Sequence, residues 1–542
     1  MAPEVSETLH SQEGSGTFRH CHGKGSLGTA RPVSVRPARG VGARLSETET
    51  NEESVRRVAT GCPGLDTVLN GGWIHGGTYM VSGAPGTGKT VLGNQLCFSH
   101  VAGGGRAVFV TMLSESHGRM MSHLRRMAFF RRELIGQSLH YVSGYATLKN
   151  EGIEGLSRLL YRSVREHQAS VLVVDGLLAA QETAGSVLVF REFLHALGVH
   201  NALAGCTTLV LTNRQANAAD PQFAMVDGVV VLGMHLDGMH AVRTVEVTKL
   251  RGEPQLTGHH VMEINDQGLV VYPRLEALYA HPPEEPAPSH ERLAFGVGPL
   301  DDMLAGGLPM HSSTLLSGAP GSGKTLLGLH FLANGVRHGE PSLYYGFMET
   351  RARLLAKAEG VGLSRPAALE TGALVVETRS PVEVLSDARA HELLALVRRQ
   401  GTRRLFLDGL GLVLDTMPSA RAFTFVTALT SALRSLGVTT VMTQRTPLAS
   451  SPGHEGALQG LEALIDNLVR LRYVEQRSQM YRLLSILKMR ESDYESTLRE
   501  FTISSAGITV ARGPQSAEAL LAGKRRPVSV KRRAPARRSK RS

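Results

Sequence analysis

One glycine-rich octapeptide occurs twice in this chain. It runs from Gly83 to Thr90 as Gly-Ala-Pro-Gly-Thr-Gly-Lys-Thr, and from Gly318 to Thr325 with serine in place of the first threonine. Both copies fit the pattern G-x-x-x-x-G-K-[ST], whose glycines let consecutive backbone N–H groups point at phosphate oxygens. The lysine places a positive charge near the β- and γ-phosphates, and the final threonine ligates Mg²⁺. The repeat therefore predicts two sites for a nucleoside triphosphate with Mg²⁺.

The residues after each loop, Val91–Ser99 and Leu326–Asn334, have the character of helices. A helix that starts at the loop turns its positive end toward the bound phosphates. The predicted ATP-binding residues are Gly83, Ala84, Pro85, Gly86, Thr87, Gly88, Lys89, Thr90 and Val91 in the first copy, and Gly318, Ala319, Pro320, Gly321, Ser322, Gly323, Lys324, Thr325 and Leu326 in the second.

The duplication extends well beyond the loops. Arg57–Gly61 aligns with Arg292–Gly296, and Leu65-Asp66 with Leu300-Asp301, at the offset that relates the two octapeptides. A proline-rich stretch separates the halves, and prolines favour extended linker backbone. The predicted organisation is a disordered N-terminal tail at 1–55, ATPase domains at 56–281 and 291–512, a linker at 282–290, and a basic disordered C-terminal tail at 513–542.

Short apolar runs alternate with amphipathic segments such as Leu156–Glu166 and Val187–Leu197. Apolar strands separated by helices predict an α/β fold with a mainly parallel sheet covered on both faces. Ligands of such sheets bind at the carboxyl ends of the strands, where both loops fall. The strands predicted in the first half are Thr78–Ser82, Arg106–Met112, Val171–Val174, Thr207–Thr212 and Gly228–Leu232.

Acidic residues follow several of these strands. Asp175 and Asp408 each end an apolar run, as expected of the second group that organises Mg²⁺ together with Thr90 and Thr325. The alternative is a helix N-cap. Glu115 follows the strand predicted at Arg106–Met112, and Glu349 follows the corresponding apolar run of the second half. A carboxylate at such a strand end can orient a water for attack on the γ-phosphate. Surface charge is the alternative reading for these two glutamates.

Each half ends in a strand that carries a basic signature. Alternation places the lysine and the following arginine on one face, and such cations suit a phosphate held by a neighbouring subunit. A solvated edge strand blunted by charge is the alternative. The residues concerned are Arg243, Lys249, Leu250 and Arg251 in the first half, and Arg482, Lys488, Met489 and Arg490 in the second.

The net charge of +11 is concentrated in the C-terminal tail. This tail is either solvated and disordered or a weak electrostatic contact for nucleic acid or an acidic partner. The scattered cysteines and the lack of a long apolar run predict a cytoplasmic protein that does not span a membrane. The basic tail residues are Lys524, Arg525, Arg526, Lys531, Arg532, Arg533, Arg537, Arg538, Lys540 and Arg541.

Together, the paired phosphate loops, the opening Arg-x-x-x-Gly-x-x-x-Leu-Asp segments, the strand-end glutamates and the Lys-Leu-Arg-Gly and Lys-Met-Arg strands resemble KaiC-type ATPases of the RecA superfamily over about residues 56–512. The resemblance implies two tandem RecA-like domains and a homo-oligomer of six subunits that acts through a signalling protein partner. It also implies ATP bound between subunits, approached from the adjacent chain by Lys249, Leu250, Arg251, Lys488, Met489 and Arg490.

The chain departs from this pattern at two places. The clock proteins of the family carry paired glutamates at the strand end, and here the first of each pair is Ser114 or Met348. Their phosphorylated Ser-Thr pair aligns with Glu462-Ala463, which has no hydroxyl group to accept phosphate. An ATP-hydrolysing signalling protein is therefore the leading expectation. A serine/threonine protein kinase with other target residues and a DNA-binding RecA-like motor are the alternatives.

Overall fold

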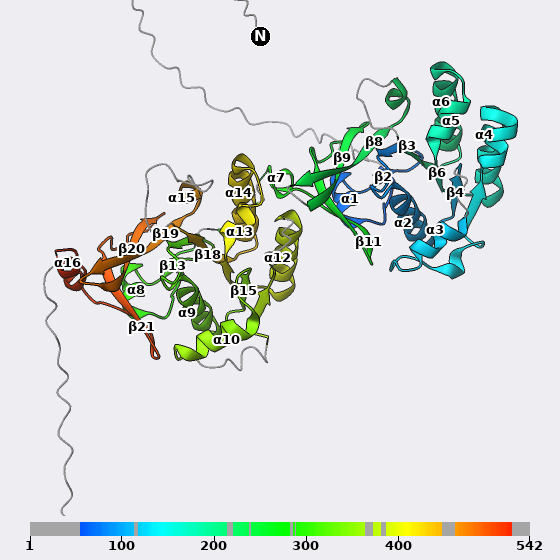
Figure 1. Ribbon diagram of the computed structural model, residues 1–542. Coiled ribbons are helices and arrows are strands. Elements are labelled where there is room, and N and C mark those ends of the chain that lie inside the picture. Colours follow the sequence, from blue (N-terminus) through cyan, green and yellow to red (C-terminus); the bar gives the residue numbers. More distant parts are fainter. Residues whose placement is uncertain are drawn as a thin grey trace, which may run out of the picture. The chain divides into compact units, whose positions relative to one another are not determined.

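The computed structural model describes residues 55–112, 117–213, 221–237, 240–281, 284, 286–287, 289–363, 372–380, 386–446, 461–490 and 492–522. In these ranges the chain forms two α/β domains, each built on a nine-stranded sheet (Figure 1). No helix in the described ranges is both long and apolar enough to cross a membrane.

The first sheet has the order β11-β10-β9-β8-β3-β7-β6-β4-β5. The strands from β8 to β5 in this order run parallel, whereas β9, β10 and β11 extend the sheet in antiparallel fashion. The bounds are β3 (Thr78–Gly83), β4 (Ala107–Thr111), β5 (Leu139–Ser143), β6 (Val171–Asp175), β7 (Thr207–Thr212), β8 (Gly228–Asp237), β9 (His240–Leu250), β10 (His260–Asn265) and β11 (Gly268–Tyr272).

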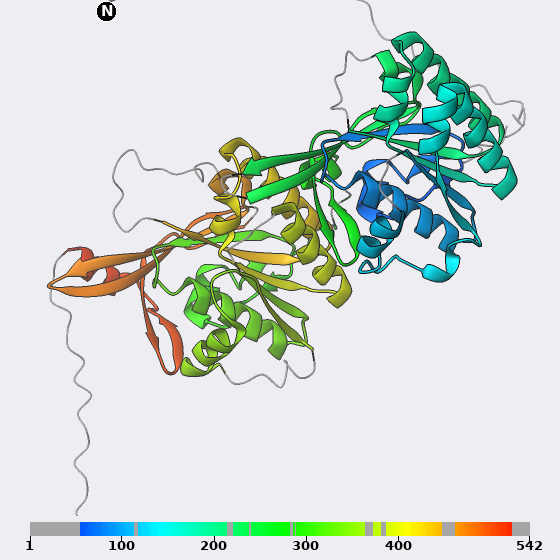
Figure 2. The same ribbon diagram turned by 45° about the vertical axis from the view of Figure 1, so that its right-hand side comes forward.

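The second sheet repeats this plan in the order β16-β15-β17-β18-β14-β19-β20-β21-β22. Here too the last three strands of the chain are antiparallel additions, and the long ribbons β8–β9 and β19–β20 stand out in Figure 2. The bounds are β14 (Ser313–Gly318), β15 (Ser342–Gly346), β16 (Leu374–Thr378), β17 (Arg404–Asp408), β18 (Thr439–Arg445), β19 (Asn467–Gln476), β20 (Gln479–Met489), β21 (Arg499–Ser504) and β22 (Gly507–Val510).

Helices cover both faces of each sheet (Figure 1). The first domain contains α1 (Pro63–Val68), α2 (Lys89–Ala102), α3 (His117–Leu124), α4 (Tyr145–His167), α5 (Leu177–Thr183), α6 (Val187–Leu203) and the 3₁₀ turns η1 (Arg132–Leu134) and η2 (Pro221–Met225); α7 (Leu275–Leu278) follows its last strand. The second contains α8 (Gly298–Met303), α9 (Lys324–Arg337), α10 (Arg351–Gly360), α12 (Ser386–Gln400), α13 (Leu410–Leu414), α14 (Ser419–Ser435), α15 (Leu461–Leu464) and α16 (Gln515–Leu521).

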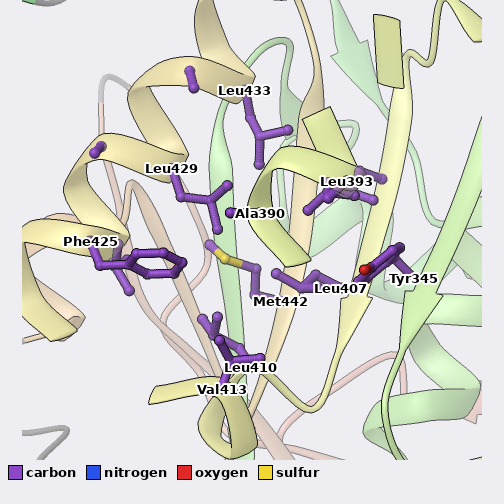
Figure 3. Close-up of a cluster of buried hydrophobic side chains, with 14 of the residues drawn as sticks. Tyr345, Ala390, Leu393, Leu407, Leu410, Val413, Phe425, Leu429, Leu433 and Met442 are labelled. Carbon is purple, nitrogen blue, oxygen red and sulfur yellow. The ribbon is translucent and has the colours of Figure 1, made fainter. Parts of the chain in front are cut away.

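Successive side chains of the central strands enter opposite cores, because side chains alternate across a strand. In β3, Tyr79 and Val81 pack in the core that contains α2, whereas Met80 packs in the core under α4, α5 and α6. In the second domain, Leu429 of α14 belongs to the cluster that also contains Met442 of β18 (Figure 3). Each fully buried aliphatic side chain contributes about 1.5–3 kcal/mol, so these two-sided cores fix the strand ends that carry the site.

Each domain opens with a two-stranded ribbon, β1 (Arg57–Val58) with β2 (Trp73–Ile74), and β12 (Arg292–Leu293) with β13 (Leu308–Pro309). The aspartate of the repeated Leu-Asp pair holds the loop between the ribbon strands: Asp66 Oδ1 accepts the Thr60 N–H at 2.7 Å. The ring of Trp73 is fully buried and packs on Tyr79 with centroids 4.6 Å apart. The repeated opening segment is therefore a structural element of the fold.

The predicted fold class is confirmed. Four of the five strands predicted in the first half are present with shifts of at most one residue at an end, and the fifth, predicted at Gly228–Leu232, continues to Asp237. Both helices after the phosphate loops begin earlier than predicted, at Lys89 and Lys324. The helix α16 lies beyond residue 512, the predicted end of the second domain, and packs against that domain through Ala517 and Leu520. Glu115 and the basic tail residues from Lys524 onward lie outside the described residues.

Candidate nucleotide-binding sites

Each phosphate loop joins a central strand to a helix, β3 to α2 and β14 to α9. The glycine before each lysine has positive φ, 108° at Gly88 and 106° at Gly323. A Cβ at Gly88 would also lie 2.7 Å from Ile264 Cδ1 of β10. Glycine is thus required at this position both for the left-handed backbone and for the close approach of the antiparallel extension.

The two lysines of the loops are buried and turned back over the loops themselves. Lys89 Nζ donates to the carbonyl oxygens of Gly83 at 2.7 Å and Ala84 at 2.8 Å, and Lys324 makes the equivalent bonds in the second domain. Burial lowers the pKa of both ammonium groups, to about 8 for Lys324, with the nearby aspartate opposing the effect in each case. A phosphate beside either lysine would favour its charged form.

The predicted metal-binding pairs come together in both domains. Thr90 Oγ1 donates to Asp175 Oδ2 at 2.8 Å, and Thr325 Oγ1 donates to Asp408 Oδ2 at 2.9 Å. Burial raises the pKa of Asp175, while the Thr90 hydroxyl and the Lys89 charge act against this. Neither aspartate caps a helix, because α5 and α13 begin after glycines without a side-chain cap. A hydroxyl beside a carboxylate is a hard oxygen donor set, which fits Mg²⁺.

The second aspartate has more hydrogen-bond partners than the first. Tyr344 of β15 donates its hydroxyl to Asp408 Oδ2 at 3.2 Å, and Thr443 of β18 donates to Asp408 Oδ1 at 2.7 Å. The strand registers place Phe109 and Leu211 at the equivalent positions beside Asp175. Asp408 is therefore held by two additional hydroxyl groups, whereas the first domain has apolar residues at the two matching register positions.

Of the two proposed water-positioning residues, the structure describes Glu349. Its Oε1 pairs with the Lys357 ammonium of α10. Its Oε2 is buried and has no hydrogen-bond partner among the described residues. A buried carboxylate oxygen without a hydrogen-bond partner is energetically unfavourable. A donor such as a water molecule that bonds to Oε2 would therefore be stabilising.

The lysines of the basic strands lie far along the sheet from the phosphate loop of their own chain. Lys249 pairs with Val229 at the start of β8. The phosphate loop leaves the sheet at the other end of the parallel strands, where Gly83 pairs with Leu232. Its ammonium donates to the carbonyl oxygens of Phe223 at 2.8 Å and Val226 at 2.7 Å. Lys488 caps the end of α15 in the same way, through Glu462, Ala463 and Ile465. The following arginines, Arg251 and Arg490, donate to carbonyl oxygens of the same segments.

The two other predicted arginines, Arg243 and Arg482, lie at the opposite end of these strands, on the side of the phosphate loops. Arg243 pairs with Met234, and Arg482 pairs with Tyr473 and lies over its ring, 5.4 Å from the centroid. The Tyr473 hydroxyl donates to the Gly321 carbonyl at 2.6 Å. The residues of each basic signature therefore lie at the two opposite ends of one strand.

Tyr344, Thr443 and Tyr473 were not predicted from the sequence. Thr443 and Tyr473 lie on the two strands that flank the loop strand β14, and Tyr344 lies on β15, beside β17. Each becomes a site residue only through its register in the sheet. Aligning the two halves strand by strand would have found them, because the first domain has apolar residues at all three positions.

The residues aligned with the phosphorylated pair of the clock proteins form part of α15. The Glu462 carboxylate pairs with Arg470 at 3.1 Å, and the backbone carbonyls of Glu462 and Ala463 accept the Lys488 ammonium. This segment thus contributes a negative charge and helix-end carbonyls, where a phosphorylated pair would need hydroxyl groups.

Comparison with known proteins agrees with this geometry. The family model described as "ATPase: KaiC" matches residues 58–276 and 293–515. The circadian clock oscillator protein KaiC of Rippkaea orientalis is 25% identical over 490 residues, covering 88% of this chain and 93% of its own. KaiC of Thermosynechococcus vestitus is 26% identical over 501 residues, with 90% and 95% covered. KaiC 1 of Synechocystis sp. is 26% identical over 492 residues, with 88% and 93% covered. The chain, with its two tandem domains, belongs to the KaiC ATPase family.

Proposed function

We propose that this protein is a regulatory ATPase that binds and hydrolyses ATP at two sites per chain, in a ring of six subunits, and signals to a protein partner through its nucleotide state. The observation that carries the proposal is the repeated constellation of loop lysine, loop threonine and strand-end aspartate, with the threonine and aspartate hydrogen-bonded in both domains. Family membership supports ATPase activity in general.

The chain's own groups divide the work at each site. Backbone N–H groups of the loop and the positive helix end receive the phosphates. The loop lysine, Lys89 or Lys324, exchanges its bonds to loop carbonyls for contacts with the β- and γ-phosphates. Thr90 with Asp175, and Thr325 with Asp408, would hold Mg²⁺. When bound, Mg²⁺ neutralises developing negative charge on the phosphate oxygens.

The adjacent-subunit role of the basic strands is supported by their position. Lys249 and Lys488 lie at the ends of the strands that are away from the phosphate loops of their own domains. From there they cannot reach the nucleotide that their own loops would hold. A ring built head to tail brings a surface of one subunit that lies away from its own loop next to the phosphate loop of the neighbouring subunit. We therefore assign these lysines and the following arginines to the nucleotide of the neighbouring chain.

The test of the whole proposal is ATP turnover by the Lys89→Ala, Lys324→Ala and doubly substituted chains. Each single variant should lose the turnover and the nucleotide binding of one site, and the double variant should lose both. Radiolabelled ATP retention and phosphate release measure the two properties separately. Wild-type turnover in the double variant would rule out the proposal.

Glu349 is assigned to water positioning in the second site. Its unpartnered Oε2 is the acceptor that an attacking water needs. With the first site silenced by Lys89→Ala, Glu349→Gln should bind ATP with unchanged affinity and hydrolyse it at least about a hundredfold more slowly, as expected for loss of a general base. Single-turnover kinetics measure the effect. Unchanged cleavage would remove Glu349 from this role.

Protein kinase activity remains a second candidate through membership of the family, but no described feature favours it. Met348 and Ala463 occupy the positions where the family's proton acceptor and phosphothreonine would lie. Mass spectrometry of the chain after incubation with Mg-ATP tests this alternative, and a phosphopeptide would establish it. A DNA-binding motor would be favoured instead by salt-dependent DNA binding that survives deletion of residues 523–542.

A further inference from the structure

Arg445 occupies a distinctive position in the second domain. It is the last residue of β18, the strand next to the loop strand β14, and it pairs in register with Gly318, the first residue of the phosphate loop. The next residue, Thr446, donates its N–H to the Gly318 carbonyl at 3.2 Å. The backbone at Arg445 is thus tied directly to the beginning of the loop.

The guanidinium of Arg445 extends along the carboxyl edge of the sheet. Its NH2 group lies 2.8 Å from Met348 Sδ, and Met348 Cγ lies near Gly409, which follows Asp408. A thioether is a weak acceptor, and arginine carries five N–H donors, so this contact orients the group without satisfying it. Within the described ranges, no carboxylate forms an ion pair with Arg445, and Glu349 pairs with Lys357 instead.

Arg445 and Lys324 form a pair of like charges at one strand edge. Arg445 pairs in register with Gly318, and the Gly318 carbonyl accepts the Lys324 ammonium, so both cations lie at the beginning of the phosphate loop. Two cations that repel each other beside a row of backbone N–H groups are stabilised together by an anion with more than one negative oxygen. The terminal phosphate of a nucleoside triphosphate is an anion of this kind.

The described part of the first domain has no cation at this register position, and Arg214, the next residue along the chain, lies outside the described residues. The strand registers Thr78↔Thr208 and Ser313↔Thr440 place Asn213 at the position of Arg445. Asn213 is exposed and follows the end of β7. The two sites thus share the lysine, threonine and aspartate but have different residues, Asn213 and Arg445, at this register position.

Building on the function proposed above, we propose that Arg445 binds the γ-phosphate in the second site and makes that site discriminate ATP from ADP. Arg445 acts from the same chain as the loop, unlike the cations of the basic strands. Because ADP lacks the γ-phosphate that Arg445 contacts, substitution of Arg445 weakens the binding of the triphosphate selectively.

The test is equilibrium binding of a fluorescent non-hydrolysable ATP analogue and of fluorescent ADP to the full chain with Lys89→Ala, so that the second site is measured. Arg445→Asn, which installs the residue of the first domain, should weaken binding of the ATP analogue roughly tenfold or more and change ADP binding less than about twofold. Arg445→Lys should recover part of the loss, because it retains the charge but not the planar donor group.

Arg399→Asn is the matched control, since Arg399 is an exposed arginine in the last turn of α12, just before the start of β17 and thus away from the strand ends that meet the phosphate loop. It should bind both nucleotides as the parent does. Equal loss of both nucleotides in Arg445→Asn, or no loss of either, would overturn the proposal for Arg445. Binding that persists after Lys324→Ala in the same background would instead overturn the proposed nucleotide site itself.

Discussion

At the scale of single residues, the two strand-end aspartates show how one motif can serve two environments. Asp175 and Asp408 both accept a hydrogen bond from the loop threonine. Asp408 receives two more hydroxyl groups, from Tyr344 and Thr443. A hydrogen bond to a carboxylate contributes about 1.5–3 kcal/mol, and these two bonds also restrict the carboxylate to one orientation.

Removing one of these hydroxyl groups should affect the second site alone. Tyr344→Phe, which installs the residue of the first domain, should weaken Mg²⁺-dependent ATP binding there by roughly two- to tenfold. Titration of Mg²⁺ into the Lys89→Ala chain with fluorescent ATP measures the shift. The Tyr345→Phe variant is the control, because the Tyr345 hydroxyl bonds Glu392 instead. Equal changes in both variants would argue for a general packing effect.

At the scale of elements, the sequence predicts those features that repeat or that follow a strong period. The buried strands around Val171–Val174 and the helices after both loops are apolar enough to be predicted. The edge strand β5 was not, because most of its residues are only half-buried and its pattern is weak. The phosphate loops, Asp175 and Asp408 are local patterns that sequence alone identifies.

Contacts made across elements could not be predicted in this way. Tyr344 and Thr443 come from strands on either side of β17, and only the sheet order brings them to Asp408. Likewise, the sequence predicts that Lys488 shares a strand face with Arg490, but not that its ammonium caps α15. Both depend on long-range register, which leaves no signature in a short window of residues.

The capping lysine gives a test of the neighbouring-subunit assignment. Lys488→Met should leave the carbonyl oxygens at the end of α15 without their charged donor, at a cost of about 1–3 kcal/mol, and should also remove a phosphate contact in the next subunit. Thermal unfolding measures the first effect. For the second, ATP turnover is measured in mixed assemblies of Lys488→Met and Lys324→Ala chains that both carry Glu115→Gln to silence the first site.

Mixed assemblies should recover turnover that neither variant shows alone, because some interfaces then combine an intact Lys324 with an intact Lys488. The same mixture with Arg399→Asn in place of Lys488→Met controls for dilution. If mixing restores nothing while Lys488→Met lowers the melting temperature, the lysine serves only the fold of its own chain.

At the scale of the whole molecule, the chain contains two copies of one domain type that differ in individual side chains. The two sheets have the same order and the same antiparallel extension, so the shared chemistry is placed identically. The differences are single side chains at matching registers: Phe109 and Tyr344, Leu211 and Thr443, Asn213 and Arg445. A duplicated fold can in this way place different side chains at matching positions of its two domains without any change of architecture.

The buried Trp73 makes this duplication experimentally separable. It is the single tryptophan of the chain, and it lies in the core of the first domain against Tyr79. Its emission, excited where tyrosine does not absorb, reports on the first domain alone, while circular dichroism reports on both. The native chain thus contains its own optical label, with which the stabilisation of each domain by nucleotide can be followed without dividing the protein.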